Sequence, residues 1–133
     1  MITGCVGGLL CPVWLPSGPA RTRFTEAGGA AAMTHLLDRF PDLDAVFAES
    51  DNMAAGALRT LRAAGRSVPE HVAVVGFDDL PIARTTEPPL TTVHQPVQAL
   101  GQEMARMLVA LMNGEQPSSL LLPTHLVVRA SAP

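Results

Sequence analysis

Two short apolar runs with a helical pattern between them constrain the fold of this chain more than any other feature. The runs cover residues 44–50 (DAVFAES) and 72–77 (VAVVGF), and short runs of this kind are typical of buried strands. Between them, Asp51 stands where it can cap a helix, and Gly65 stands where a helix commonly ends. The apolar residues at helical spacing in this interval are Ala54, Ala57, Leu58 and Leu61. A strand, helix, strand unit is parallel and right-handed. The sequence therefore predicts an α/β fold, with an open parallel sheet, flanking helices and both faces of the sheet covered.

A second helix is expected just before the first run. Thr25 can cap its start, Glu26 suits its first turn, and Pro41 stops it. Its apolar positions at helical spacing are Ala30, Met33, Leu37 and Phe40. Residues 1–23 contain glycine, proline, tryptophan and cysteine without helical or strand periodicity. They are therefore set apart as an atypical N-terminal segment.

Polar side chains follow both apolar runs. Glu49, Ser50 and Asp51 come at the end of the first run, and Asp78 and Asp79 come at the end of the second. The carboxyl ends of parallel strands meet at one edge of a sheet, and ligands bind at that edge in open α/β folds, so we expect these side chains to face a ligand. Three interpretations are open. The three aspartates hold a divalent metal, or carboxylates accept from the hydroxyls of a neutral polyol or nucleoside, or the acidic rim only caps neighbouring backbone.

Composition excludes several classes of function. The 133 residues carry a net charge of −3 with no clustered basic face, so there is no electrostatic footprint for nucleic acid. All nine basic residues are arginine, which excludes a P-loop phosphate site because that site needs a lysine. Cys5 and Cys11 make no zinc pattern and are expected to be free thiols. No serine lies in a G-x-S-x-G elbow, and the four histidines are scattered without helical metal spacing. We expect a non-enzyme that uses no cofactor and no metal.

Three motifs in order carry a resemblance to a known family. They are DNMAAGAL at residues 51–58, VVGFDD at residues 74–79 and PPLTTVHQ at residues 88–95. Together with the flanking segments FTEAGGAAAM and LLLPTHLVVRAS, the chain from residue 24 to about residue 131 resembles the effector-binding domain of LacI-type bacterial transcription repressors. The resemblance implies a periplasmic-binding-protein-like C-terminal subdomain that is incomplete here. Residues 24–133 would then form a partial effector-binding domain.

The resemblance implies four ligand-binding residues. The residue matching Asp78 hydrogen-bonds sugar or nucleoside hydroxyls in the family, and the residue matching Gln95 lies near the pocket between subdomains. The match to Phe24 is an aromatic that packs on the ligand ring, and the match to Ser50 is commonly asparagine, so this chain keeps a hydroxyl but loses the amide. Phe24 can instead be a hydrophobic staple ahead of its helix, and Gln95 an ordinary loop amide.

The resemblance also implies partners and a compartment. A cytoplasmic, ligand-responsive transcriptional regulator would bind a small sugar or nucleoside effector, and would bind DNA only through a helix-turn-helix for which this chain has no candidate segment. The alternatives are a periplasmic-type sugar-binding module, disfavoured because no signal-peptide pattern is seen, a non-functional relic, or an oligomerisation module. Residues 1–23 would then come from a shifted reading frame, a mis-assigned start or a truncated gene.

A third apolar stripe is expected to mediate association. It consists of Val97, Leu100, Met104, Met107, Leu108 and Leu111, and Gly114 ends the run. A helix with one continuous apolar face must pack on something. We therefore expect a homodimer, or other self-association, through the helix of residues 97–112, or a helix that folds back over the sheet.

Overall fold

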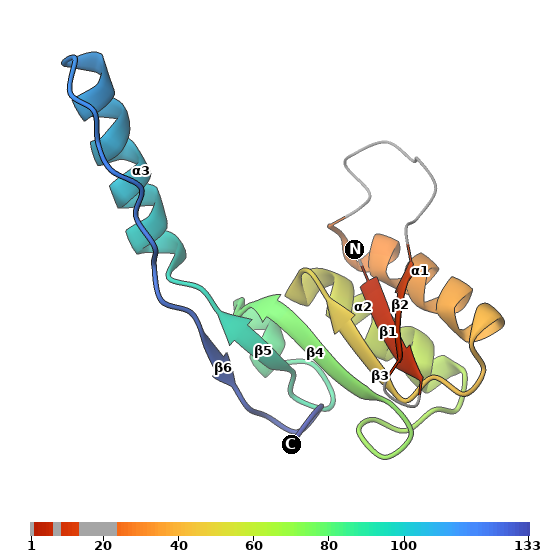
Figure 1. The fold of residues 1–133 in the computed structure, drawn as a ribbon. Helices are drawn as coiled ribbons and strands as arrows, with labels where there is room; N and C mark the ends of the chain where they lie inside the picture. Colours follow the sequence, from red (N-terminus) through yellow and green to blue (C-terminus); the bar gives the residue numbers. More distant parts are fainter. Residues whose placement is uncertain (1, 7–8, 14–23) are drawn as a thin grey trace.

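The structure is a computed structural model that describes residues 2–6, 9–13 and 24–133. Across these residues, six strands form one sheet in the order β2-β1-β3-β4-β5-β6 (Figure 1). The strands are β1 (Ile2–Val6), β2 (Leu9–Val13), β3 (Ala45–Ala48), β4 (Ala73–Asp78), β5 (Thr91–His94) and β6 (His125–Val127). The helices are α1 (Glu26–Arg39), α2 (Asp51–Ala63) and α3 (Val97–Met112), with a short 3-10 helix, η2 (Pro81–Arg84).

The middle of the sheet is the predicted parallel unit. Strand β3 pairs parallel with β4, and β4 pairs parallel with β5. The outer strands are antiparallel, because β1 and β2 form a hairpin beside β3 and β6 returns beside β5. The α/β fold class predicted from the sequence is confirmed, and the whole sheet is mixed. Ten residues of the segment that sequence periodicity set apart therefore add two strands to the sheet edge.

The ends of α1 and α2 follow their local signals, with one correction. The side chain of Thr25 accepts from the backbone N–H of Gly28 at 3.1 Å, which confirms it as the N-cap of α1. At the end of α2, Gly65 has φ of +70°, and the next residue closes the helix by donating to a carbonyl five residues back. The prediction that Asp51 caps α2 is wrong, since Ser50 holds that position. The Asp51 side chain accepts hydrogen bonds from Leu80 and Thr92 instead, which lie 29 and 41 residues away in the sequence.

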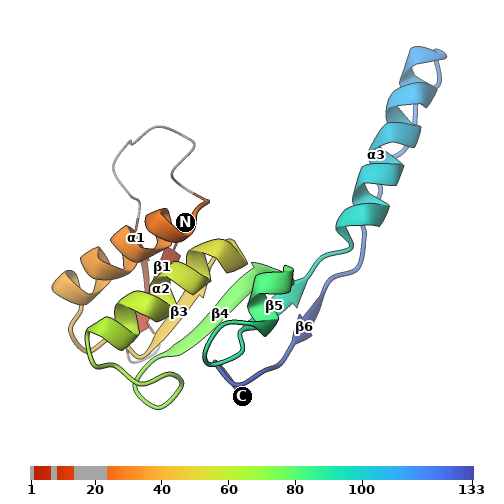
Figure 2. The ribbon, with the colours of Figure 1, turned by 180° about the vertical axis from the view of Figure 1, so that it is seen from behind.

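The core lies between the sheet and one layer of helices. Figure 2 shows α1 and α2 on the same face of the sheet. The inward residues predicted for α2 are all buried there. Of those predicted for α1 only Met33 is buried, and the helix buries Gly28, Gly29, Ala32 and Leu36 beside it. Burial alternates along β4, with Val74 fully buried and its neighbours only partly so. On the opposite face Phe47 is 37% exposed and meets Phe77 edge to face, with ring centroids 6.4 Å apart. The expectation that both faces are covered is therefore not met within the described residues.

Helix α3 projects away from the sheet, so the alternative that it folds back over the sheet is wrong (Figure 1). It spans the predicted residues, and none of its side chains is buried. Strand β5 leads into it, and the chain runs back alongside it to β6 (Figures 1 and 2). Among the described helices, none is long and apolar enough to cross a membrane.

Candidate functional site

The carboxyl ends of β3, β4 and β5 lie at one edge of the sheet, as the parallel pairing requires. At this edge Gln95, which follows β5, donates from Nε2 to Oδ1 of Asp78 at 2.5 Å. Both residues line an open hollow of about 530 Å³. Its other lining residues are Asp79, Leu80, Pro81, His94, Pro96, Val97, Gln98 and Ala99. A carboxylate and an amide therefore converge on a hollow that also has apolar walls.

The backbone turns sharply at the end of β4. Asp78 has φ of 107° and Asp79 has φ of 55°, so two consecutive non-glycine residues take positive φ angles. Such conformations cost about 1–3 kcal/mol each and persist where surrounding contacts hold them, often at binding sites. Here the side chain of Asp79 supplies such contacts.

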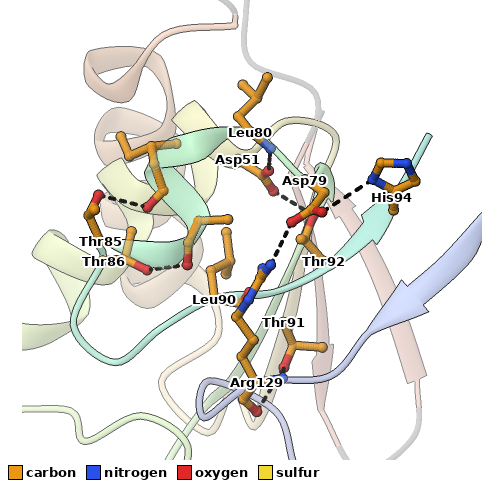
Figure 3. Close-up of polar contacts among 12 residues, drawn as sticks. Asp51, Asp79, Leu80, Thr85, Thr86, Leu90, Thr91, Thr92, His94 and Arg129 are labelled. Carbon is orange, nitrogen blue, oxygen red and sulfur yellow. Dashed lines mark hydrogen bonds and ion pairs between the residues drawn. The ribbon is translucent and has the colours of Figure 1, made fainter. Parts of the chain in front are cut away.

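Asp79 is held by two side chains, one from the neighbouring strand β5 and one from the C-terminal segment that follows β6 (Figure 3). Arg129 donates to its Oδ1 at 2.6 Å, and Nδ1 of His94 lies 3.2 Å from its Oδ2. Burial alone would raise the pKa of Asp79. The hydrogen bonds from Arg129 and His94, and the charge of Arg129, outweigh that effect and lower the pKa below its usual value. Asp79 is therefore an ionised structural anchor at the rim of the hollow.

Asp51 anchors the same edge from inside the core. Its side chain is fully buried and accepts from the backbone N–H of Leu80 at 2.7 Å and from Oγ1 of Thr92 at 2.6 Å (Figure 3). Burial raises the pKa of this carboxyl, and the two hydrogen bonds reduce the shift without cancelling it. Asp51 thus joins the start of α2 to β5 and to the turn that carries Asp78.

The four predicted ligand-binding residues do not all meet. Asp78 and Gln95 lie together, while Ser50 is only 5% exposed and Phe24 is 57% exposed just before α1. Neither Ser50 nor Phe24 lines the hollow. Their roles toward a ligand stay predictions, as do those of Asp78 and Gln95.

The sequence alone did not single out His94, Thr92 or Arg129. Thr92 and His94 lie two residues apart within the PPLTTVHQ motif. Because alternate residues of a strand point to the same face, assigning this motif to a strand could have placed both side chains on one face of the sheet. Arg129 is 50 residues from Asp79, so no local spacing indicates their ion pair.

The metal interpretation finds no support in this arrangement. Oxygens of Asp51 and Asp79 already accept hydrogen bonds from protein donors. Within the part of the chain that the structure describes, no group of three or more histidine, cysteine, aspartate or glutamate side chains could hold a metal ion. The capping interpretation fits only one contact, the Leu80 N–H that donates to Asp51, and Asp51 is buried rather than part of a solvated rim. Asp79 pairs instead with the side chains of Arg129 and His94. Asp78 is the carboxylate that meets Gln95 at the hollow.

Comparison with known proteins identifies the family. Residues 16–132 match the periplasmic binding protein-like domain. The chain belongs to this family. It is 58% identical over 110 residues to the HTH-type transcriptional regulator CelR of Thermobifida fusca. It is 38% identical over 118 residues to the HTH-type transcriptional repressor CytR of Escherichia coli.

These alignments cover most of this chain but only part of each relative. They take in 81% and 87% of the chain, against 32% of CelR and 35% of CytR. The chain therefore spans about a third of the length of the curated relatives it matches.

Solved structures show the same likeness. A complex of the transcriptional regulator CelR with cellobiose matches with a TM-score of 0.77 and 57% identity, covering 82% of this chain and 34% of that one. The lac repressor dimer bound to operator and the anti-inducer ONPF matches with a TM-score of 0.74 and 31% identity, covering 81% of this chain and 38% of that one. The resemblance to LacI-type regulators read from the motifs is confirmed.

Proposed function

We propose that this chain is the effector-binding part of a cytoplasmic, ligand-responsive transcriptional regulator and that it binds a small sugar. The observation that carries the proposal is the Asp78–Gln95 pair at the open hollow on the carboxyl edge of the sheet. In open α/β folds this edge is where ligands bind. DNA binding belongs to the whole regulator and is proposed by analogy with the HTH-type relatives.

The chemistry of the hollow suits a sugar. The carboxyl group of Asp78 accepts from ligand hydroxyls, and the hydrogen bond from Gln95 holds that group in one orientation. Apolar walls from Leu80, Pro81 and Val97 suit the carbon face of a pyranose ring. The similarity to CelR, for which a cellobiose complex is known, favours a glucose disaccharide over a nucleoside as the first ligand to test.

Titration of the ¹⁵N-labelled chain with cellobiose, followed by NMR, tests the proposal. We expect saturable shifts of the amide signals of Asp78, Gln95 and Val97, and smaller or no shifts with cytidine. No saturable shift with any sugar tested up to about 10 mM would contradict the proposal, because a dissociation constant above the millimolar range corresponds to less than about 4 kcal/mol of binding.

A pair of substitutions assigns the carboxylate. Asp78→Asn removes a charged hydrogen bond worth about 1.5–3 kcal/mol, so cellobiose affinity should fall about tenfold to hundredfold. Asp79→Asn should weaken binding less, because Asp79 is occupied by Arg129 and His94. The control is Asp42→Asn, in the turn before the amino end of β3, which should leave cellobiose affinity unchanged. Equal losses for Asp78→Asn and Asp79→Asn would remove the assignment.

We further propose that a second copy of this chain covers the apolar face of α3. No residue of α3 is buried, and Val97, Leu100, Met104, Met107 and Leu111 are alternately three and four residues apart. That spacing is the a and d pattern of paired helices. The charged side chains of α3 are Glu103 and Arg106, which form an ion pair with each other at 2.7 Å. Two copies can therefore approach without net charge repulsion.

A further inference from the structure

Two histidines face each other across β5 and β6, close to the root of α3. His94 and His125 are directly opposite in the antiparallel register. Side chains of directly opposed residues lie on the same face of a sheet with their Cβ atoms about 4.5–5.5 Å apart. Their ring centroids are 4.9 Å apart with planes inclined by 37°. His125 is exposed and the His94 side chain is 38% exposed, so both imidazoles are open to solvent.

The orientation of His94 is set by a second interaction. Its Nδ1 lies 3.2 Å from Oδ2 of Asp79, and Oδ1 of Asp79 accepts from Arg129. An ionised carboxylate only accepts hydrogen bonds, so Nδ1 of His94 is the donor to Asp79 and Nε2 is the ring nitrogen left to bind another partner. A carboxylate that binds the far nitrogen of an imidazole is the usual support of a metal-ligating histidine.

We propose that His94 and His125 together bind a divalent transition-metal ion of the kind that prefers imidazole, such as Zn²⁺. Nε2 of His94 and one ring nitrogen of His125 would be the two protein ligands. Imidazole suits Zn, Cu and Ni, whereas Mg²⁺ and Ca²⁺ prefer oxygen ligands. Because the described residues include no third ligating side chain in the cluster, water completes the coordination and the site stays open.

The position of the pair gives the ion a structural consequence. An ion shared by β5 and β6 would link the strand that enters α3 to the strand that returns from it. His94 also lines the hollow next to Asp78, so a bound ion would change one wall of that hollow. The metal site does not depend on the sugar proposal, since it can be tested in the absence of any sugar.

Isothermal titration with Zn²⁺ tests the site in the full chain carrying Cys5→Ser and Cys11→Ser. These two substitutions remove thiols, which bind zinc strongly by themselves. We expect one Zn²⁺ per chain and no measurable binding of Mg²⁺. His94→Gln and His125→Gln should each lower Zn²⁺ affinity at least tenfold, whereas His35→Gln on the exposed side of α1 should leave it unchanged.

Asp79 is a positioning residue in this proposal, and its effect is separable from folding. Asp79→Asn should lower Zn²⁺ affinity about tenfold to hundredfold, as outer partners of metal ligands commonly do. The imidazole ¹⁵N shifts of His94 should also lose the signature of a proton fixed on Nδ1, while circular dichroism reports whether the fold is retained. The absence of Zn²⁺ binding up to about 1 mM, or binding that persists when both histidines are replaced, would overturn the inference.

Discussion

Replacing Asp51 by alanine should destabilise the protein more than any other single substitution at the carboxyl edge of the sheet. The side chain is fully buried and accepts two hydrogen bonds, from the Leu80 backbone N–H and from Thr92 Oγ1. Its removal leaves both donors without this acceptor in the interior. A buried donor left unsatisfied costs about 1–3 kcal/mol, so the two together cost about 2–6 kcal/mol.

Part of this cost is offset by the carboxylate itself. Burial raises the pKa of Asp51, which means that the ionised form is less favourable in the folded state than in the unfolded chain. Removing the carboxylate relieves that penalty, so we expect a net loss of about 2–4 kcal/mol. This is a large share of the roughly 5–15 kcal/mol by which small domains are stable.

A double-mutant cycle with Thr92→Val isolates the pair. Thr92→Val alone leaves the buried carboxylate with one donor fewer and should cost about 1.5–3 kcal/mol. The double variant should cost less than the sum of the two single variants, because neither partner then remains unpaired. Urea unfolding followed by circular dichroism measures all four proteins. A loss below about 0.5 kcal/mol for Asp51→Ala, or a strictly additive cycle, would refute the reasoning.

Three further outcomes are expected. The folded-state pKa of Asp79 is lowered, so its ion pair with Arg129 contributes stability that is present above about pH 4 and is lost as the pH falls through the lowered pKa. Urea unfolding at a series of pH values should therefore show that Arg129→Met flattens the acid side of the stability profile. In sedimentation equilibrium at micromolar concentration the chain should self-associate, and Leu100→Glu should shift it toward monomer while the control Gln102→Glu on the same helix has no effect. A monomeric parent chain would contradict the pairing of α3. Gly56→Ala should lower the free energy of unfolding measured with urea by about 1–3 kcal/mol, because the added methyl group would overlap the backbone of α1. An unchanged free energy of unfolding would show that α1 and α2 can move apart without cost.

Local sequence determined the three α-helices, strands β3 and β4, and the place of the acidic residues, but it did not indicate β1 and β2. The apolar runs became β3 and β4, Thr25 capped α1, and Gly65 ended α2. These features depend on neighbours within a few residues, because helix caps, turn conformations and the 3.6-residue period are local properties of the chain. Parallel pairing of β3 and β4 then follows from the intervening helix. For this reason the sequence could place Ser50 and Asp78 at one edge of the sheet.

Only the tertiary structure decided what each polar side chain does there. Asp51 has every local feature of a helix cap, yet Thr92, 41 residues away, and Leu80 offer it buried hydrogen bonds inside the core. Asp78 and Asp79 are adjacent in sequence, but Gln95 donates to Asp78 whereas Arg129 forms an ion pair with Asp79. These choices depend on the register between strands and on how the C-terminal segment returns to the sheet, and neither is encoded in the spacing of nearby residues.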